Sequence, residues 1–519
     1  TTGVGNAALG FNALLDNTTG ATNVGLGYQA LANNTTASNN VAVGSNAAVT
    51  NTTGTNNVAV GQASLDANTT GSGNVAIGKD ALTENTTADN NVAIGLFALN
   101  NNTASGNVAI GKDALLGNTT GSSNIGIGLD AGTAITTGNQ NIAIGNEALL
   151  ATTTNSGNTA VGYIALQDNT ADHNTAVGGQ ALLQNTTGTR NVAVGSFSLD
   201  ANTTASENTA VGYAALSANT TGANNTSVGR SALSNNTTAD NNTAVGYNAL
   251  GENTTGSENT AVGTGSLDEC TTGSAHVGIG FSALQSVTDG SHNTAVGRSA
   301  GDQITTGSNN TAIGSQAADN LTTGSANVCM GVDVADTLTT GSNNILIGNT
   351  ARPSASGGAT QISMGTVVTC VGDNNFTFGN GGTDSNIAFG ATSITAPSDI
   401  RLKEDIQDET IGLDFLNDLR PVTFIWKKEK DIPTEMKAYK EDSEERTMNG
   451  KYNHGFIAQE VKATIEKHGL KEGFDMWQED EADGRQRVAP SAAVPLMIKA
   501  IQELSAKVDE LQQQLNSKE

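Results

Sequence analysis

The chain has 519 residues, of which only 4% are aromatic and 14% charged, while 62 are glycine. So few bulky residues cannot fill an ordinary globular core, yet Val, Ile, Ala and Leu recur too regularly for disorder. The formal net charge is −26 and no basic stripe is visible, which argues against nucleic acid and anionic membranes as partners. No apolar run reaches membrane length, so we expect no membrane insertion.

Residues 1–350 repeat one pattern. The glycine of the motif N-V-A-I-G recurs from Gly10 to Gly348 at a spacing of 17 residues, which shortens to 16 at only two places. Alternation with period two puts Val and Ile on one face of a short strand and Ala on the other. Each repeat adds a second apolar segment, Ala-Leu, and a polar Asn-Thr-Thr turn.

This pattern predicts a mainly β fold, a parallel β-roll or β-solenoid whose coils each hold two short strands and two turns. Ala is small and recurs in every coil, which suits close contact between chains about an axis, so we favour a homotrimeric rod. The motif N-V-A-[V/I]-G-x-x-A resembles the head repeats of trimeric autotransporter adhesins. That resemblance implies three parallel β-rolls side by side.

The repeats show no residue set suited to chemistry. Cys270, Cys329 and Cys370 are far apart and form no metal-ligand spacing, so we expect neither a metal nor a cofactor. Cys329 replaces the Ala of the motif and is interpreted as a small packed hydrophobe. We expect no enzymatic activity from this part of the chain.

Two features of the repeats leave alternatives open. Tyrosines that follow the repeat glycine could stack on sugars or could be tolerated surface residues. The Asn-Thr-Thr turns match the glycosylation sequon but could serve only as turns. The tyrosines are Tyr28, Tyr163, Tyr213 and Tyr247.

Residues 351–397 lose the regular pattern and contain short strand candidates at 361–365, 376–379 and 386–390. We predict a β-structured neck here, although a tapering cap on the solenoid fits equally well. Residues 398–519 differ in composition, because they hold 18 of the 24 Lys and Arg residues and both tryptophans. A helix is expected at 411–419, a strand at 420–426 and a charged loop at 427–450.

The end of the chain shows heptad spacing, which predicts a coiled-coil helix at about 494–516. We favour self-association through this seam as the route to trimerisation. The alternative is an amphipathic helix that packs on its own domain. The seam residues are Met497, Ile501, Leu504, Val508, Leu511 and Leu515.

Four segments of residues 398–519 closely resemble one known domain, the intramolecular-chaperone, self-cleaving domain at the C-terminus of phage endosialidase tailspikes and related tail fibres. The resemblance implies an α+β domain that trimerises, guides folding of the preceding fibre and then cuts the Ser398–Asp399 bond. Ser398 and Lys403 match the family's Ser/Lys dyad. The segments are S-D-I-R-L-K-E-D-I (398–406), R-P-V-T-F-I-W (420–426), H-G-F-I-A-Q-E-V (454–461) and V-P-L-M-I-K-A-I-Q-E-L (494–504).

A serine hydroxyl attacks well only when a base takes its proton, and a lysine is a base only when burial or nearby cations lower its pKa. Arg401 is a cation that could contribute. Attack by Ser398 on its own carbonyl would close a strained four-membered ring. Two routes remain: Ser398 of a neighbouring chain, or a water activated by Lys403.

From these features we expect a structural and adhesive fibre, a phage-type tail fibre or spike shaft on the virion surface, outside the host cell. Its partners would be two further copies of itself and a host receptor or glycan. The only enzymatic act would be one self-cleavage per chain. The alternatives are a trimeric bacterial surface adhesin and a glycan-degrading tailspike, although no carboxylate pair for hydrolysis stands out.

Overall fold

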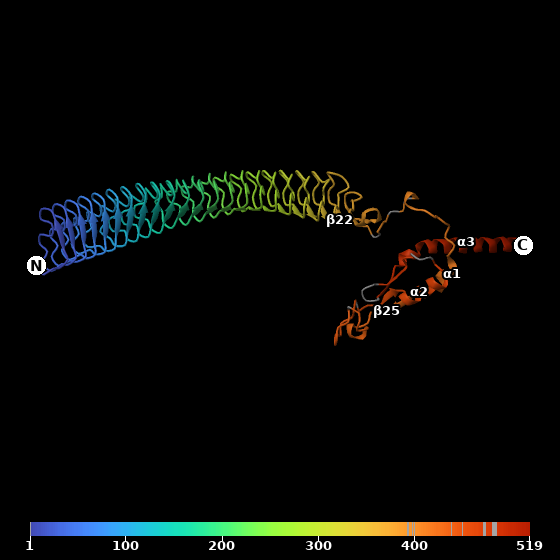
Figure 1. Cartoon of the computed structure of the whole chain (residues 1–519). Helices are drawn as coiled ribbons and strands as arrows, with labels where there is room; N and C mark the ends of the chain where they lie inside the picture. The colour runs from blue at the N-terminus through green and yellow to red at the C-terminus, as the bar shows by residue number, and fades with distance from the viewer. Residues whose placement is uncertain are drawn as a thin grey trace. The chain divides into compact units, whose positions relative to one another are not determined.

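A computed structural model describes residues 2–391, 394–396, 398, 400–436, 438–448, 450–470, 474–479 and 485–518. The chain divides into two compact units, Thr1–Pro397 and Ser398–Glu519, and Figure 1 draws both. The first unit is the predicted solenoid, with one three-residue strand in each coil.

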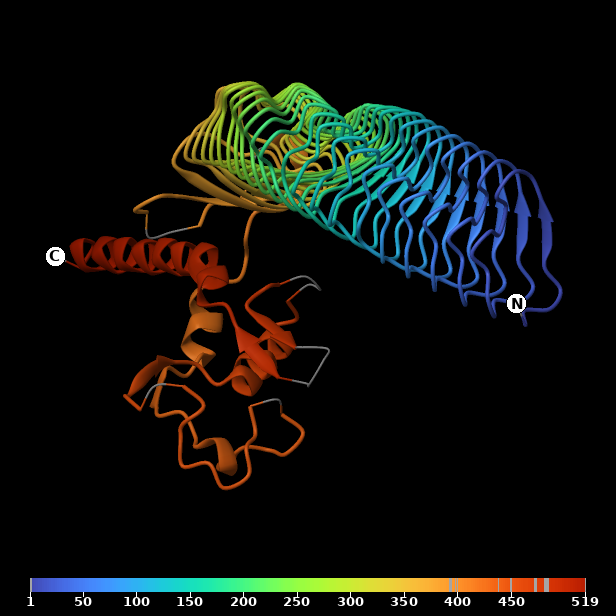
Figure 2. The same cartoon turned by 90° about the vertical axis from the view of Figure 1, so that its left-hand side faces the viewer.

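Every strand of the solenoid pairs in parallel with the strand of the next coil, in a register that matches motif to motif. Figure 2 shows these strands side by side near the N-terminus. The first 21 strands are β1 Ala7–Leu9, β2 Val24–Leu26, β3 Val41–Val43, β4 Val58–Val60, β5 Val75–Ile77, β6 Val92–Ile94, β7 Val108–Ile110, β8 Ile125–Ile127, β9 Ile142–Ile144, β10 Thr159–Val161, β11 Thr175–Val177, β12 Val192–Val194, β13 Thr209–Val211, β14 Thr226–Val228, β15 Thr243–Val245, β16 Thr260–Val262, β17 Val277–Ile279, β18 Thr294–Val296, β19 Thr311–Ile313, β20 Val328–Met330 and β21 Ile345–Ile347.

The prediction of two strands per coil is wrong. The Ala-Leu segment lies in a turn, because the residues two and four positions after the glycine adopt left-handed backbone conformations, as at Asp80 (φ 54°) and Leu82 (φ 51°). A left-handed residue cannot continue an extended strand. The turns still pair from coil to coil, for example through the Leu82 N–H and the carbonyl of Ala98, 3.1 Å apart.

The small face of each strand points into the coil. In β5, Ala76 is fully buried, whereas Val75 is partly exposed and Ile77 is exposed. The core of most coils therefore consists of this Ala, the Ala-Leu turn residues and asparagines. The expectation that Ala lies between chains is wrong, since one chain encloses it completely.

Two columns of buried asparagines run along the inside of the solenoid. Column A holds the residue four positions before each repeat glycine. In this column the side chain of Asn242 bonds two backbone groups of later turns: its Oδ1 accepts from the Asn259 N–H at 2.9 Å and its Nδ2 donates to the Gly256 carbonyl at 2.9 Å. Column A therefore satisfies backbone groups that water cannot reach.

One residue of column A shows what the position requires. His276 replaces asparagine, and its Nε2 lies 2.7 Å from the Gly290 carbonyl while its Nδ1 accepts from the Asn293 N–H at 3.2 Å. Burial lowers the pKa of His276 to about 4. The neutral ring thus offers one donor and one acceptor, the same pair that an asparagine offers.

Column B holds the residue seven positions after each glycine, which is the asparagine of most Asn-Thr-Thr turns. Within this column Asn34 Nδ2 donates to Asn17 Oδ1 at 2.8 Å and to the Ala37 carbonyl at 3.0 Å. That carbonyl also accepts from Asn23 of column A at 2.8 Å. Column B is apolar in the last coils, where it holds Cys270, Val287, Ile304, Leu321 and Leu338.

The burial of column B decides between the two interpretations of the Asn-Thr-Thr sequons. Asn34 and its equivalents are buried, with their amide nitrogens in hydrogen bonds inside the coil. An N-glycan could not be accommodated at such a position in the folded solenoid. The Asn-Thr-Thr segments are therefore turns whose asparagines belong to the core.

The repeat glycine cannot be exchanged for another residue. Gly195 has φ +132°, a conformation that other residues rarely adopt, and a Cβ built on it would lie 2.4 Å from the Gly212 carbonyl oxygen. The same close approach recurs between successive repeat glycines along the shaft.

The three cysteines are free and buried, and burial raises the pKa of Cys270 and Cys329 to about 12 and that of Cys370 to about 11. The interpretation of Cys329 as a small packed hydrophobe is confirmed. Among the described residues, no helix is long and apolar enough to cross a membrane, and no three metal-ligating side chains come together.

The strand stack continues past residue 350 into the segment predicted to be a neck. β22 Ile362–Thr366 pairs in parallel with β21, and β23 Asn375–Asn380 with β22. β24 Ser385–Ala388 then turns back antiparallel to β23. Gly365 keeps the 17-residue spacing from Gly348, and Gln361 occupies column A, so the coil pattern continues into residues 351–397.

The second unit is a small α+β domain. Its core holds Phe415, Val461, Met476, Ala493 and Leu496. Its elements are the 3-10 turn η2 Ile400–Leu402, α1 Leu413–Asp418, β25 Val422–Phe424, η3 Glu429–Asp431, β26 Asn453–Gly455, α2 Ala458–Lys467, β27 Trp477–Glu479, β28 Gln486–Val488, η4 Pro490–Ala493 and α3 Val494–Asn516; β25 pairs with β26 and β27 with β28, both antiparallel.

The two asparagine columns should respond differently to the same substitution. Asn242→Leu strands the Asn259 N–H without a partner, at a cost of about 2–3 kcal/mol. Asn253→Leu in column B should cost less, because the Gly256 carbonyl that Asn253 contacts at 3.0 Å also accepts from Asn242. Only the Asn236 Oδ1 acceptor, 2.8 Å from Asn253 Nδ2, loses its donor. Moreover, Asn253 Oδ1 has no hydrogen-bond partner within the described residues.

Thermal denaturation of both variants, followed by circular dichroism, checks this expectation. Thr221→Ala, at an exposed turn position one coil away, serves as the control. Equal losses for Asn242→Leu and Asn253→Leu would contradict the distinct roles of the two columns.

Candidate functional site

The structure brings together the two residues predicted to form a dyad. The turn η2 lies between them, and the Lys403 N–H donates to the Ile400 carbonyl at 3.2 Å. The chain thereby folds back, and Lys403 Nζ donates to Ser398 Oγ at 2.7 Å. Asp399, on the other side of the predicted cleavage point, lies outside the described residues.

In this geometry the lysine acts as a donor to the hydroxyl. Once the amine is neutral, the same contact lets it accept the hydroxyl proton, which is the first step of nucleophilic attack by serine. Ser398 and Lys403 are both exposed in the single chain. Water could reach the pair directly, and so could the surface of another chain.

The predicted seam lies on one helix, α3, and its six residues are between 48% and 65% exposed. The structure adds Val494 and Ile498, which are also about half exposed. Counting one heptad back from Ile501 leads to Val494, so the sequence contained this signal. The Pro495 that follows it lies in the first turn, where proline is tolerated.

A different face of α3 packs on its own domain. Leu496 and Ala500 are buried there, and Glu503 Oε2 accepts from the N–H of Leu413, the first residue of α1, at 2.9 Å. Packing on the domain and an exposed seam are thus properties of two faces of the same helix. Beyond Ala500, nearly every residue of α3 is exposed.

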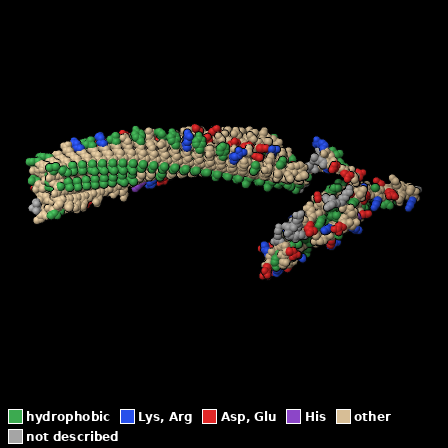
Figure 3. Space-filling view, in the orientation of Figure 1, with side chains coloured by type: hydrophobic (Ala, Val, Ile, Leu, Met, Phe, Trp, Pro, Cys, Tyr) green, Lys and Arg blue, Asp and Glu red, His purple; other side chains and the backbone are tan. Residues whose placement is uncertain are grey.

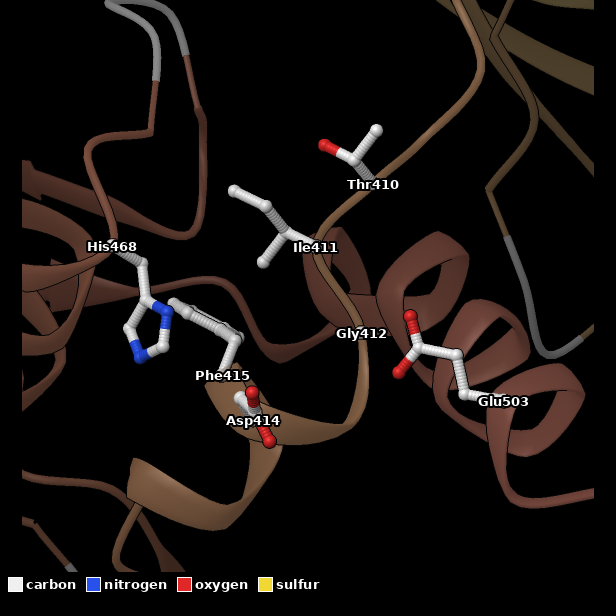
Figure 4. A pocket seen from close by; sticks show the side chains of 7 residues that line it. All are labelled: Thr410, Ile411, Gly412, Asp414, Phe415, His468 and Glu503. Atoms are coloured by element: carbon white, nitrogen blue, oxygen red, sulfur yellow. The ribbon is translucent and has the colours of Figure 1, made fainter. Parts of the chain in front are cut away.

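A shallow pocket of about 150 Å³ lies between α1, the end of α2 and α3 (Figure 4). His468 Nε2 lies 2.5 Å from Asp418 Oδ2, and Lys467 Nζ donates to the same oxygen at 2.7 Å. Hydrogen bonds from these two residues lower the pKa of Asp418. These contacts join α1 to α2. The pocket is lined by Thr410, Ile411, Gly412, Asp414, Phe415, His468 and Glu503.

A family model confirms the resemblance of the second unit. Residues 398–470 match the peptidase S74 family, which is described as the chaperone of endosialidase. The match begins at Ser398, directly after the solenoid unit. No curated protein and no solved structure matches the chain. A β-solenoid followed by a domain of this kind fits a protein of the tail fibre or spike type.

The contact between Glu503 and α1 can be tested by itself. Glu503→Ala removes the acceptor of the Leu413 N–H, so we expect the free energy of unfolding of residues 398–519 to fall by about 1–2 kcal/mol. Both tryptophans, Trp426 and Trp477, lie in this unit, so urea unfolding followed by tryptophan fluorescence reports on it selectively.

Glu510→Ala on the exposed part of α3 is the matched control, since within the described residues the Glu510 side chain hydrogen-bonds only to Gln514 of its own helix. A loss for Glu510→Ala as large as that for Glu503→Ala would refute a specific role for the contact with α1.

Proposed function

We propose that this chain is a structural and adhesive fibre, a trimeric tail fibre or spike shaft of the phage type that acts outside the host cell. Residues 398–519 serve as its intramolecular chaperone. The observation that carries the proposal is the order of the two parts: a solenoid of nearly identical coils leads directly into a segment that matches the chaperone of endosialidase.

The uniform coils explain why such a fibre needs a template. Three chains with nearly identical repeats can align in many registers, shifted by whole coils, that have similar energies. A C-terminal domain that trimerises first would bring the three chain ends to the same level. Folding would then proceed from that end in a single register.

The exposed faces of the solenoid strands offer the surface for the other chains. The third residues of the strands, mostly Val and Ile, form one apolar row along the shaft, and the first residues form a second row that holds Thr in many of the later coils. Rows of hydrophobic side chains are visible in Figure 3. Members such as Ile77, Ile110 and Val194 are about one-third exposed in the single chain. Extended apolar surface of this kind is typical of protein interfaces. The rows therefore take the role that the sequence had suggested for Ala.

Self-cleavage would then release the chaperone. Hydrolysis breaks the C–N bond between Ser398 and Asp399, adds one water, and leaves a carboxylate on Ser398 and an amine on Asp399. The hydrogen bond between Ser398 and Lys403 supports this role. Attack by Ser398 of a neighbouring chain and attack by a water that Lys403 activates both remain compatible with the exposed pair.

Loss of the chaperone would also make assembly irreversible. Once the template is gone, the three chains lose the element that nucleates their assembly and their unwinding, so the fibre becomes kinetically trapped.

The dyad predicts a simple pattern of products. Wild-type protein should give a fragment that ends at Ser398 and a second of 519 − 398 = 121 residues. Ser398→Ala removes either the attacking hydroxyl or the group that holds Lys403 Nζ in place, so this chain should stay at full length. Lys403→Arg should also stay at full length, because arginine stays protonated and cannot act as a base. Intact mass spectrometry distinguishes these products.

Lys427→Arg, at an exposed lysine outside the pair, should cut normally. Cleavage of Lys403→Arg at the wild-type rate would remove the lysine from the mechanism. A wild-type chain that stays uncut after folding would contradict self-cleavage altogether.

The seam predicts the assembly state. Leu504→Asp and Leu511→Asp place charges at core positions of a coiled coil, so we expect the uncut Ser398→Ala chain to lose its trimer in native mass spectrometry. Gln512→Asp changes the residue after Leu511, which is not part of the seam; it is the matched control and should remain trimeric. A monomeric Ser398→Ala parent would contradict the proposal at once.

A further inference from the structure

The aromatic residues of the shaft all lie at one edge of the coil. Residues 1–350 contain eight aromatic residues, and each comes one or two positions after a repeat glycine. Four of the six basic residues that precede Ser398 also come directly after that glycine: Lys79, Lys112, Arg230 and Arg298. The eight aromatic residues are Phe11, Tyr28, Phe97, Tyr163, Phe197, Tyr213, Tyr247 and Phe281.

Exposure alone does not explain this placement. Other positions of the coil are just as exposed, such as those of Thr36 and Asn39, yet none of their equivalents is aromatic. Phe97 and Phe197 even adopt a left-handed backbone, both at φ 58°, which is unfavourable for a bulky residue. The rings are therefore concentrated at this edge despite a conformational cost.

Four of these residues form a continuous cluster across four consecutive coils. The ring of Phe197 packs edge-on against Tyr213, with centroids 5.8 Å apart. The guanidinium of Arg230 lies 5.9 Å from the ring centroid of Tyr213 and 5.8 Å from that of Tyr247. Tyr213 is 52% exposed and Tyr247 49%. We call Phe197, Tyr213, Arg230 and Tyr247 the aromatic–arginine cluster.

The charge of Arg230 sets this cluster apart from the two lysines of the edge. Lys79 and Lys112 form ion pairs with the adjacent Asp80 and Asp113. Among the described residues, no carboxylate pairs with Arg230, and the residue that follows it is Ser231. A cation without an ion-pair partner thus lies between two exposed rings, on a shaft whose net charge is strongly negative.

We propose that the aromatic–arginine cluster binds an extended glycan that carries carboxylate groups. The C–H faces of sugar rings would pack on Tyr213 and Tyr247, and a sugar carboxylate would pair with the Arg230 guanidinium. The two tyrosines lie two coils apart, or about 10 Å, which is about the length of two linked sugar rings. The glycan strand would run along the shaft.

This inference rests on the proposed role in host attachment and adds the site and the ligand class. It also requires that the cluster stays accessible in the fibre. Figure 3 shows basic side chains above the continuous hydrophobic rows, so the two surfaces need not compete. The rows are free to meet other chains while the edge faces outward.

Binding of alginate oligosaccharides, which consist of uronic acids, to the full-length trimeric Ser398→Ala chain tests the proposal. We expect binding in isothermal titration calorimetry, and none of the neutral polymer dextran. Arg230→Gln and Tyr213→Ala should each weaken binding at least tenfold. Tyr163→Ala changes an exposed tyrosine at the same coil position outside the cluster and should bind as the parent does.

Three results would overturn the inference: no binding of alginate or of oligogalacturonate by the parent chain, unchanged affinity in both cluster variants, or equal losses in Tyr163→Ala. Nitration of tyrosines adds an independent measurement. If Tyr213 and Tyr247 are protected in the glycan-free trimer while Tyr163 reacts, the cluster lies between chains and the inference is wrong.

Native mass spectrometry on the same samples distinguishes a failure of the glycan site from a failure of the proposed trimeric fibre. An intact trimer that binds neither uronate probe would refute only the glycan site. A chain that does not form trimers would refute the proposed function itself.

Discussion

The solenoid depends on one kind of interaction: the hydrogen bonds made by the buried asparagines of column A, four positions before each repeat glycine. Nearly every asparagine side chain in this column bonds an N–H and a carbonyl of the backbone inside a coil that excludes water, as Asn242 does. A buried backbone group without a partner costs as much as several packed methyl groups contribute. This requirement, together with the close contact between successive glycines, fixes the shape of every coil and leaves variation to the exposed positions.

Because the coils are alike, the shaft alone does not determine the register between chains, and this is the problem that the second unit can solve. Coils of one shape stack equally well in any order, so the shaft contains little information about register. Residues 398–519 are different in kind, with a compact core and a helix that presents an apolar seam to solvent. In the proposed fibre, this exposed seam would pack against further copies of the same chain. The Ser398–Lys403 contact lies at the start of the second unit.

Much of this organisation could be predicted from the sequence, because periodicity reflects repeated structure directly. The 17-residue coil and the seam of α3 follow from spacing, and the boundary at Ser398 follows from a change of composition. Alternation predicted that Val75 and Ala76 lie on opposite faces but could not tell which face is inside. Leu82 follows the strand in a left-handed turn and shares a buried core with Ala76, so the Ala face is the inner one. Residue type alone does not predict the left-handed conformation.

The asparagines show the same limit, since a polar residue in a turn motif suggests the surface. Asn34 is buried because its side chain bonds groups of neighbouring coils, and those partners exist only after stacking. The dyad is a further case. The five-residue separation of Ser398 and Lys403 has no meaning until the turn η2 brings the two side chains into contact.

Cryo-electron microscopy of the assembled shaft tests the central claim most directly. The account predicts three chains side by side, with equivalent coils at the same height and the rows of Val and Ile facing one another. A rod made of one chain, with these rows in solvent, would contradict it, as would three chains staggered by one or more coils.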